Sequence, residues 1–567
     1  MKNWRFYALV FFISLIFIIV IFRFFSLQAL KYSLYKTLAF NQHQTFQIIE
    51  PLRGEIFMRD RYTSSDSRSL LFPVALNKDL YTVYAIPNII EDKDEAIEQL
   101  FPILEMDKSI LEFRINKVDD PYEPLKNKID EQTAEIIKNL NIKGIDLKRE
   151  NWRYFPANDM ACHLLGFVGF DEDKKIGRYG IEENYEDELG GEQGFVEAKR
   201  DSLGNILSVN NNVLKEAEDG ADIILTIDPN VQYFVEEILE KSIKDLDAES
   251  GTILVMDIKT GAIKAMASYP AFNPNEYNEV KNINVFLNPA IQELFEPGSI
   301  FKPITMAAAL DSGAVTPRTT YEDKGSIAIS GYILKNATDG IKGIQTMVQV
   351  LEKSLNTGAI FAQQQIGKDN FKKYVEKFGF NEKTGIDLKG ELNGNLSNLN
   401  KKQDLEYATA AFGQGIAITS IQMITALSAI ANDGILLRPY VVEKIIYKDG
   451  SEKITETKER RRVISSQTAS KLTAMLISVV DNGFSRKAGV EGYKIAGKTG
   501  TAQIAEAGGY SEETIHSFGG FFPGLSPRFS ILVKIDKPKT IRFASDSVTP
   551  IFSKIAKYIL NYYEIAP

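Results

Sequence analysis

Ser299 and Lys302 have the residue types and the spacing of a nucleophile beside a base. Residues 296–298 read Glu-Pro-Gly, which predicts a loop, and the apolar run 300–310 predicts a buried helix. Pro303 then falls in the first helical turn, where its missing N–H is not needed. Since residues three apart share one helix face, we expect the Lys302 amine to reach the Ser299 hydroxyl. The pair predicts a serine activated by a lysine base.

Lys302 can act as a base only in its neutral form. Its pKa must therefore fall from roughly 10.4, which requires burial and a second cation nearby. Lys498 is the candidate cation. Ser354 and Asn356 lie at the end of an amphipathic stretch that starts at Met347, which would present their hydroxyl and amide to the same cleft. We expect these two residues to relay a proton and to hold a substrate amide.

A predicted strand, residues 493–503, holds the last group of candidates, which are Lys498, Thr499, Gly500 and Thr501. Two further strand candidates follow it, so we expect it to form an antiparallel edge. The glycine would let a substrate backbone approach closely, and Lys498 and Thr499 would bind a terminal carboxylate. The backbone N–H groups of Thr501 and Ser299 would form an oxyanion hole. Together these segments predict a serine acyl-transferase.

Copies of each short motif also occur elsewhere, so order and context must decide between them. The spare copies start at Ser33 (Ser-x-x-Lys), Ser208 (Ser-x-Asn), Lys259 and Lys383 (both Lys-Thr-Gly). Lys259 stands between two strand-like runs, which predicts a hairpin turn, and Lys383 falls in a predicted loop. For an isolated copy of so short a motif we expect a structural role.

The ordered motifs Ser-Ile-Phe-Lys, Ser-Leu-Asn and Lys-Thr-Gly-Thr resemble the signature of the penicillin-binding proteins and serine β-lactamases. The likeness is close to the class B penicillin-binding proteins, which are monofunctional cell-wall D,D-transpeptidases, and it spans nearly the whole chain. Within that class, the stretch 354–358 and the segment at Phe412 resemble the division-type or sporulation-type branch. The other segments that carry the resemblance begin at Arg53, Arg153, His163, Gly180, Phe295, Thr384, Phe412 and His516.

The resemblance implies an α/β fold of the α+β type, with a five-stranded antiparallel sheet between helical layers and an elongated pedestal domain. It implies that Ser299, activated by Lys302, attacks the penultimate D-Ala carbonyl of a peptidoglycan stem peptide and releases D-Ala. An amine of a second stem then resolves the ester. β-Lactams would acylate the same serine, and no metal or cofactor is implied. Nothing resembles a glycan polymerase domain, so the implied partner is a SEDS-family (shape, elongation, division and sporulation) glycosyltransferase.

Residues 6–25 predict a membrane anchor. The run 6–22 is uncharged and almost wholly apolar, and Arg23 can snorkel, which gives the roughly 20 residues that a bilayer needs. No small-x-small cleavage signal follows. We expect a single-pass protein of the cell membrane with a cytoplasmic N-terminus and an extracytoplasmic bulk. The expected parts are a tail at 1–5, the anchor at 6–25, the pedestal at 26–221 and the transpeptidase domain at 222–567.

Within the second domain, a strand at 222–228, a helix after Pro229 and a last helix at 551–563 are predicted. Composition excludes other classes of function. The net charge of −9 and the isoelectric point near 5.3 leave no electrostatic footprint for nucleic acid. The three histidines are scattered and Cys162 is the single cysteine, so we expect neither a zinc site nor a histidine-based triad. His516 is expected to be structural or to support a bound carboxylate.

Alternatives stay open. Residues 492–499 match a phosphate loop, although the glycines that follow would break the long helix that such a nucleotide-binding loop must open. A catalytically inactive or β-lactam-sensing membrane scaffold would keep the same fold. A D,D-carboxypeptidase is compatible with the same residues. A β-lactamase needs a base that activates water against the acyl-enzyme, in one class a glutamate four residues before an asparagine, and Lys389 stands in that place before Asn393.

Overall fold

The computed structural model describes residues 44–567 apart from 64–69, 119, 172–173, 201–205, 339 and 507–508. The described residues form two compact units, one with residues 44–53 and the described part of 190–220, and the other with the described parts of 54–189 and 221–567. In the first unit, β1 (Gln44–Ile49), β8 (Gly194–Arg200) and β9 (Ile206–Lys215) form an antiparallel sheet. No helix among the described residues has the length and apolar character needed to cross a membrane. The predicted tail and anchor, 1–5 and 6–25, lie outside the described residues.

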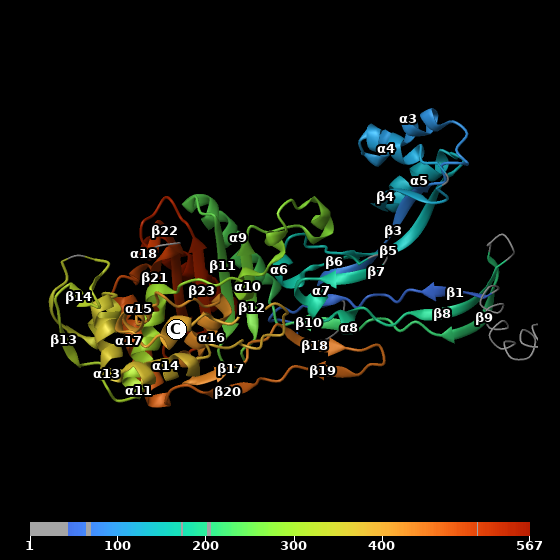
Figure 1. The fold of residues 1–567 in the computed structure, drawn as a ribbon. Coiled ribbons are helices and arrows are strands. Elements are labelled where there is room, and N and C mark those ends of the chain that lie inside the picture. The colour runs from blue at the N-terminus through green and yellow to red at the C-terminus, as the bar shows by residue number, and fades with distance from the viewer. Residues whose placement is uncertain are drawn as a thin grey trace, which may run out of the picture. The chain divides into compact units, whose positions relative to one another are not determined.

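The second unit contains a five-stranded antiparallel sheet, which is the sheet that the resemblance implied (Figure 1). In order across the sheet the strands are β12 (Ile263–Tyr269), β11 (Ser250–Asp257), β23 (Phe529–Asp536), β22 (Gly509–Phe522) and β21 (Ala496–Glu506). The β11–β12 hairpin forms one edge and the β21–β22 hairpin forms the other.

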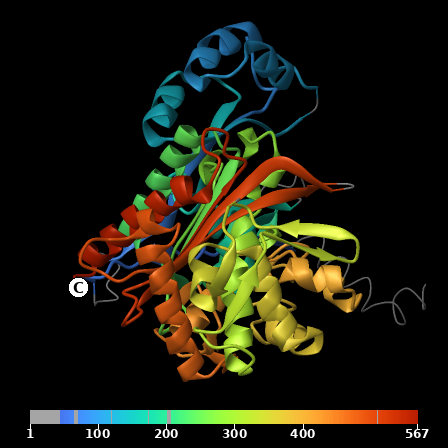
Figure 2. The same cartoon turned by 90° about the vertical axis from the view of Figure 1, so that its left-hand side faces the viewer.

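Both faces of this sheet are buried, which explains why its central strands are almost continuously apolar. Along β11, Ile253 belongs to the core under α9 (Pro229–Leu246) and α18 (Ala544–Tyr562), whereas Leu254 belongs to the core on the opposite face. On that opposite face α16 (Ser420–Ala431) packs against β11, β22 and β23. Figure 2 shows helices on both sides of the sheet.

Local sequence signals fix the start of α9 but not that of α18. The Asp228 carboxylate accepts hydrogen bonds from the backbone N–H groups of Asn230 at 3.0 Å and Val231 at 3.3 Å, so α9 has the predicted position. The last helix, predicted from residue 551, begins at Ala544 instead. Its Ala544 N–H donates to Thr501 Oγ1 at 3.2 Å, and a cap supplied from a distant strand leaves no local signal.

A seven-stranded sheet joins segments from both sides of the predicted boundary at residue 222. β10 is the strand predicted at 222–228; it pairs in parallel with β2 and antiparallel with β18. The division into a 26–221 pedestal and a 222–567 domain stays a prediction. The strands are β19 (Glu452–Ile454), β18 (Val442–Ile446), β10 (Asp222–Leu225), β2 (Ile56–Met58), β3 (Phe72–Ala85) and β4 (Glu123–Ile129), with β5 (Ile145–Tyr154) paired to β3.

A buried ion pair connects three of the segments that carried the resemblance. Arg153 Nε donates to Glu182 Oε1 at 2.6 Å, and Arg153 Nη1 donates to the Gly54 carbonyl at 2.8 Å. Removing one partner of such a pair would leave an uncompensated buried charge. Arg153, Glu182 and Gly54 belong to motifs that are separate in the sequence, and in the folded chain they are in direct contact.

The helices that surround the sheets complete the second unit. Those that bear on the site below are η5 (Gly298–Phe301), α11 (Lys302–Asp311), α12 (Met347–Glu352), α13 (Asn356–Ile366) and α17 (Ser466–Asn482). The other elements are α3 (Lys93–Leu104), α4 (Lys108–Ile115), α5 (Glu131–Asn139), α6 (Cys162–Leu165), β6 (Phe167–Asp171), β7 (Lys174–Arg178), α7 (Gly180–Asn184), α8 (Glu186–Leu189), η3 (Pro274–Glu279), η4 (Ile283–Phe286), α10 (Pro289–Gln292), β13 (Thr320–Asp323), β14 (Ser326–Ile329), β15 (Tyr332–Lys335), β16 (Gly343–Thr346), α14 (Lys368–Lys377), η6 (Ser397–Asn400), α15 (Asp404–Ala410), β17 (Ile435–Leu437), β20 (Glu459–Arg462) and η7 (Arg486–Ala488).

Candidate active site

Ser299 lies on the 3-10 turn η5, which runs directly into α11. The predicted helix is present, but its α-helical part begins at Lys302 rather than one turn earlier. Pro303 lies in the first turn, as predicted. Ser299 is half-buried, whereas the Lys302 side chain is almost wholly enclosed, with 1% of its surface exposed. The turn therefore leaves Ser299 partly accessible and encloses the Lys302 side chain.

The segment 412–418 holds the Ser299 turn in place. The Gly298 N–H donates to the Gly413 carbonyl at 2.9 Å, and Phe295 and Ile418 exchange two backbone hydrogen bonds of 2.9 Å. Gly413 has a φ of 82°, and a Cβ there would lie 2.2 Å from the Gly298 carbonyl oxygen. Only glycine fits this approach. This segment was one of those that carried the resemblance, and in the structure it holds the Ser299 turn by backbone hydrogen bonds.

The Lys302 amine is directed at Ser354. Its Nζ donates to the Ser354 carbonyl at 2.6 Å and to Ser354 Oγ at 3.2 Å. Ser354 lies between α12 and α13 with a φ of 53°, in the left-handed region that a serine rarely adopts. In the described chain no hydrogen bond joins Lys302 to Ser299, so the expected direct bond is not formed. Catalytic hydrogen bonds of this kind often tighten only when a substrate is bound.

The charge of one buried lysine, Lys498, acts on a second buried lysine, Lys302. Lys498, on β21, is also only 1% exposed, and its Nζ donates to the Thr499 carbonyl at 3.0 Å. Burial, and after it the charge of Lys498, hold the pKa of Lys302 well below its ordinary value. Burial lowers the pKa of Lys498 to about 7. Both conditions that a lysine base requires, burial and a second cation, are thus present.

The strand with the last candidates is an edge strand, as predicted. In the described sheet β21 pairs with β22 alone, so its other edge carries backbone groups that an extended peptide could pair with. Along it Thr499 is 8% exposed, and Thr501 is exposed with its hydroxyl accepting from Ala544.

Gly500 serves the protein's own packing. A Cβ at Gly500 would lie 2.6 Å from Ser517 Oγ and 2.9 Å from the Pro297 carbonyl oxygen. Likewise a Cβ at Gly298 would lie 2.9 Å from Ala502 Cβ. The sequence attributed the glycine of this motif to the approach of a substrate backbone. Here the space is already taken, so the missing side chain lets the Ser299 turn come close to β21.

Asn356 starts α13, and its Nδ2 donates to the Lys335 carbonyl at 2.8 Å. Behind it lies a buried network that sequence reasoning missed. Thr357 Oγ1 donates to Asp323 Oδ1 at 3.0 Å, and Asn336 Nδ2 donates to Asp323 Oδ2 at 2.9 Å. This network ties the hairpins of residues 320–346 to the first turn of α13, where Asn356 sits. Its members are remote in sequence and match no motif, so no local signal could have found them.

The spare motif copies that the structure describes are in a turn, a loop and a strand. Lys259 is in the turn between β11 and β12, as predicted, and Lys383 is in a loop. Ser33 lies outside the described residues, and the side chain of Ser208 on β9 is not described. The phosphate-loop alternative is wrong, because Lys498 lies in a strand where that motif requires a helix start.

His516 is fully buried, with its Nδ1 at 2.8 Å from Ser547 Oγ and its Nε2 at 3.1 Å from Thr514 Oγ1. Burial lowers its pKa to about 4, so it is neutral at pH 7. Its contacts hold β22 to α18, which fits the structural role expected for it.

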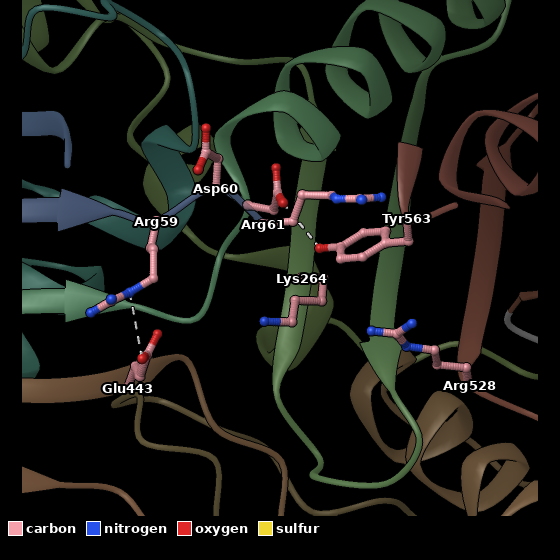
Figure 3. A pocket seen from close by; sticks show the side chains of 8 residues that line it. Arg59, Asp60, Arg61, Lys264, Glu443, Arg528 and Tyr563 are labelled. Carbon is pink, nitrogen blue, oxygen red and sulfur yellow. Dashed lines mark hydrogen bonds and ion pairs between the residues drawn. The ribbon is translucent and has the colours of Figure 1, made fainter. Parts of the chain in front are cut away.

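A separate polar cavity of about 320 Å³ contains none of the predicted site residues (Figure 3). Tyr563 there donates its hydroxyl to Asp228 at 3.0 Å, and Arg59 pairs with Glu443 at 3.6 Å. It borders β12, the sheet edge opposite to β21. Of its lining residues, Asp228 caps the start of α9.

Known proteins resemble the chain over most of its length. A family model described as the penicillin binding protein transpeptidase domain matches residues 251–557, and one for the penicillin-binding protein dimerisation domain matches residues 48–225. Stage V sporulation protein D of Bacillus subtilis is 34% identical over 527 residues, with 91% of this chain and 79% of that protein covered. The probable peptidoglycan D,D-transpeptidase PenA of Neisseria meningitidis is 27% identical over 551 residues, with 95% and 90% covered. Penicillin binding protein 2X from Streptococcus thermophilus has the same fold, with a TM-score of 0.74, 23% identity and 92% and 81% covered.

Proposed function

Because the chain belongs to the class B penicillin-binding proteins, we propose that it is a serine-type peptidoglycan D,D-transpeptidase that works through an acyl-enzyme on Ser299. One observation carries the assignment of the nucleophile. The buried amine of Lys302, one turn after Ser299, has a pKa held well below its ordinary value by burial and by Lys498. A neutral amine at that place is a base for the serine proton.

In the first half-reaction Ser299 Oγ attacks the penultimate D-Ala carbonyl of a stem peptide while Lys302 takes its proton. The Ser299 and Thr501 N–H groups would stabilise the oxyanion. The C–N bond then breaks, and the proton passes through Lys302 and Ser354 to the departing D-Ala amine. Lys498 and Thr499 hold the terminal carboxylate, and Asn356 holds a substrate amide. In the second half-reaction an amine of another stem attacks the ester, its proton returns to Ser299, and the crosslink forms.

Ser299 acylation has a direct test. The full-length protein in detergent should gain one covalent penicillin adduct by intact mass, and peptide mapping should place it on Ser299. Ser299→Ala should gain none, because the ester oxygen is missing. Ser312→Ala, at the other end of α11, is the matched control and should label like the wild type. An adduct elsewhere, or no adduct in the wild type, would contradict the proposal.

An assay of D-Ala release and of joining to an acceptor amine distinguishes the remaining alternative functions. An inactive or β-lactam-sensing scaffold would label but would not release D-Ala from a stem peptide. A D,D-carboxypeptidase would release it without joining an acceptor amine. A β-lactamase is disfavoured because Lys389 donates to the Glu183 carbonyl at 3.0 Å, and the Glu391 carboxylate is taken by the N–H groups of Thr384 at 2.6 Å and Gly385 at 3.1 Å. Neither is free to activate water against the acyl-enzyme.

The anchor and the partner are also proposals. Residues 6–25 would hold the enzyme in the cell membrane with the catalytic part outside, and a SEDS-family glycosyltransferase would supply the glycan strands. The relative named as a stage V sporulation protein supports the division-type or sporulation-type branch.

We expect that exchanging residues 6–22 for an unrelated membrane helix keeps penicillin labelling and membrane association but weakens co-purification with such a polymerase. Deletion of residues 1–26 should release the protein from the membrane. If co-purification survives the exchange unchanged, the helix is a tether alone and the proposed contact is lost.

A further inference from the structure

Glu296, three residues before Ser299, binds two segments that are far away in the sequence. Its Oε1 accepts the Gly415 N–H at 3.0 Å, and its Oε2 accepts the Tyr510 hydroxyl at 3.1 Å. Both carboxylate oxygens are thus used, one for the segment 412–418 and one for the β21–β22 hairpin. Burial raises the pKa of Glu296, whereas the hydrogen bonds from Gly415 and Tyr510 lower it. Burial is the larger effect, so the pKa of Glu296 is raised overall, and the two donors offset part of this rise.

The hairpin that Tyr510 belongs to is bent near this contact. The pairing of β21 with β22 shifts its register between Gln503 and Ala505. Such a bulge bends the strand and increases its twist. Gln503 Nε2 also donates to the Ser511 carbonyl at 3.1 Å, which closes the hairpin just beyond the shift. The outer half of the edge strand is therefore positioned by side chains as well as by its backbone ladder.

The other end of the contact is equally fixed. The Gly415 carbonyl accepts from Asn398 Nδ2 at 2.7 Å, and Gly413 is locked against Gly298 by the close approach described above. Glu296 thus links the segment 412–418, which bonds to the Ser299 turn, to Tyr510 on β22. Tyr510 pairs in turn with Ala505 on the outer part of β21. That part, from Thr501 to Glu506, is where an extended peptide would pair with the free edge.

We propose that Glu296 and Tyr510 form a clasp that positions the outer edge of β21 for peptide substrates, and that it sets the preference for a stem peptide over a small acylating agent. This proposal rests on the proposed function, because it assumes that Ser299 is acylated. A stem peptide would lie along several residues of the edge, so its binding depends on where the hairpin stands. A penicillin reaches Ser299 and the Lys498 motif without needing the outer edge. Glu296 and Tyr510 act through the strand and are positioning residues.

Tyr510→Phe tests the clasp, because it removes only the hydroxyl. We expect kcat/KM for D-Ala release from a stem pentapeptide to fall about tenfold, mainly through KM, while penicillin acylation changes less than about twofold. Hydrogen exchange of the amides in 502–506 and 509–512 should become faster, whatever the activity. Glu296→Gln should retain most of the peptide activity, since its amide can accept from Gly415 and donate to Tyr510. Tyr233→Phe, on α9 with 63% of its surface exposed, is the matched control and should change nothing.

Equal losses for peptide and penicillin in Tyr510→Phe, or unchanged hydrogen exchange, would overturn the clasp. A wild-type protein that gains no Ser299 adduct would instead overturn the proposed function. In that case the hydrogen-exchange comparison still decides whether the hydroxyl holds the hairpin, so the two failures can be told apart.

Discussion

Replacing Lys302 by methionine is expected to lower the rate of Ser299 acylation by roughly 10³-fold and, in the same protein, to stabilise the fold. The kinetic loss follows from removing the only amine placed to take the serine proton in the mechanism proposed. Acylation is measured as the second-order rate of penicillin labelling at pH 7. Stability is measured by denaturant unfolding of the unlabelled protein.

The gain in stability follows from the direction of the pKa shift. The pKa of Lys302 is well below its ordinary value in the fold and is ordinary in the unfolded chain, so the unfolded chain binds more protons than the folded protein at pH values between the two. Stability therefore rises with pH between the lowered pKa and roughly 10.4, and at pH 7 the lysine costs the fold free energy. Methionine fills similar space without that cost, so we expect a gain of about 1 kcal/mol or more. The loss of the Lys302 hydrogen bonds to Ser354 reduces this gain in stability.

Lys534→Met is the matched control. Lys534 is also 1% exposed, but it pairs with Asp536 at 2.7 Å and Glu293 at 3.2 Å. Burial lowers its pKa, yet the two carboxylates more than offset this and raise the pKa overall. Its removal leaves buried negative charge, so we expect a loss of about 3 kcal/mol. If both variants lose similar stability, or if Lys302→Met labels within tenfold of the wild type, Lys302 is not the base.

The elements around the site follow from sequence where the signal is local. Asp228 followed by Pro229 predicts the start of α9. The neighbouring apolar residues Ile253 and Leu254, which point to opposite faces, suit a strand that is buried on both faces. The order of the three motifs, with a lysine one turn after a serine, was enough to name every side chain of the proposed mechanism. These features depend on residues that are close together in the chain or on a chemistry that needs fixed residue types.

The remaining features of the fold and the site depend on contacts between segments that are distant in the sequence. The start of α18 is set by Thr501, the turn of Ser299 by Gly413, and the first turn of α13 by Asp323. From the sequence, the missing side chain of Gly500 was taken to make room for a substrate backbone. The sequence does not show that the Pro297 carbonyl lies where that side chain would be. The Glu296 contacts were missed for the same reason, since Gly415 and Tyr510 are more than a hundred residues away.

Lys498 is expected to set the upper pH limit for substrates that end in a carboxylate. In the free enzyme its pKa is about 7, because the side chain is buried. Its cationic form attracts the carboxylate, so kcat/KM for a stem pentapeptide should fall about tenfold for each pH unit above that value. On the acid side, kcat/KM should rise with pH through the lowered pKa of Lys302, because only the neutral amine takes the serine proton.

A donor whose terminal carboxylate is amidated isolates this effect. It should react about 10²-fold more slowly near pH 6, where Lys498 is charged, and its profile should lack the fall above pH 7, since no carboxylate remains to be held. Lys498→Met should slow the free-acid donor by a similar factor and also remove its falling limb. With the charge gone, the pKa of Lys302 loses the repulsion that lowers it, so the rising limb of the variant should move to higher pH. A rising limb that stays in place, or a falling limb that survives amidation, would mean that the two buried lysines do not act on each other and on the carboxylate in this way.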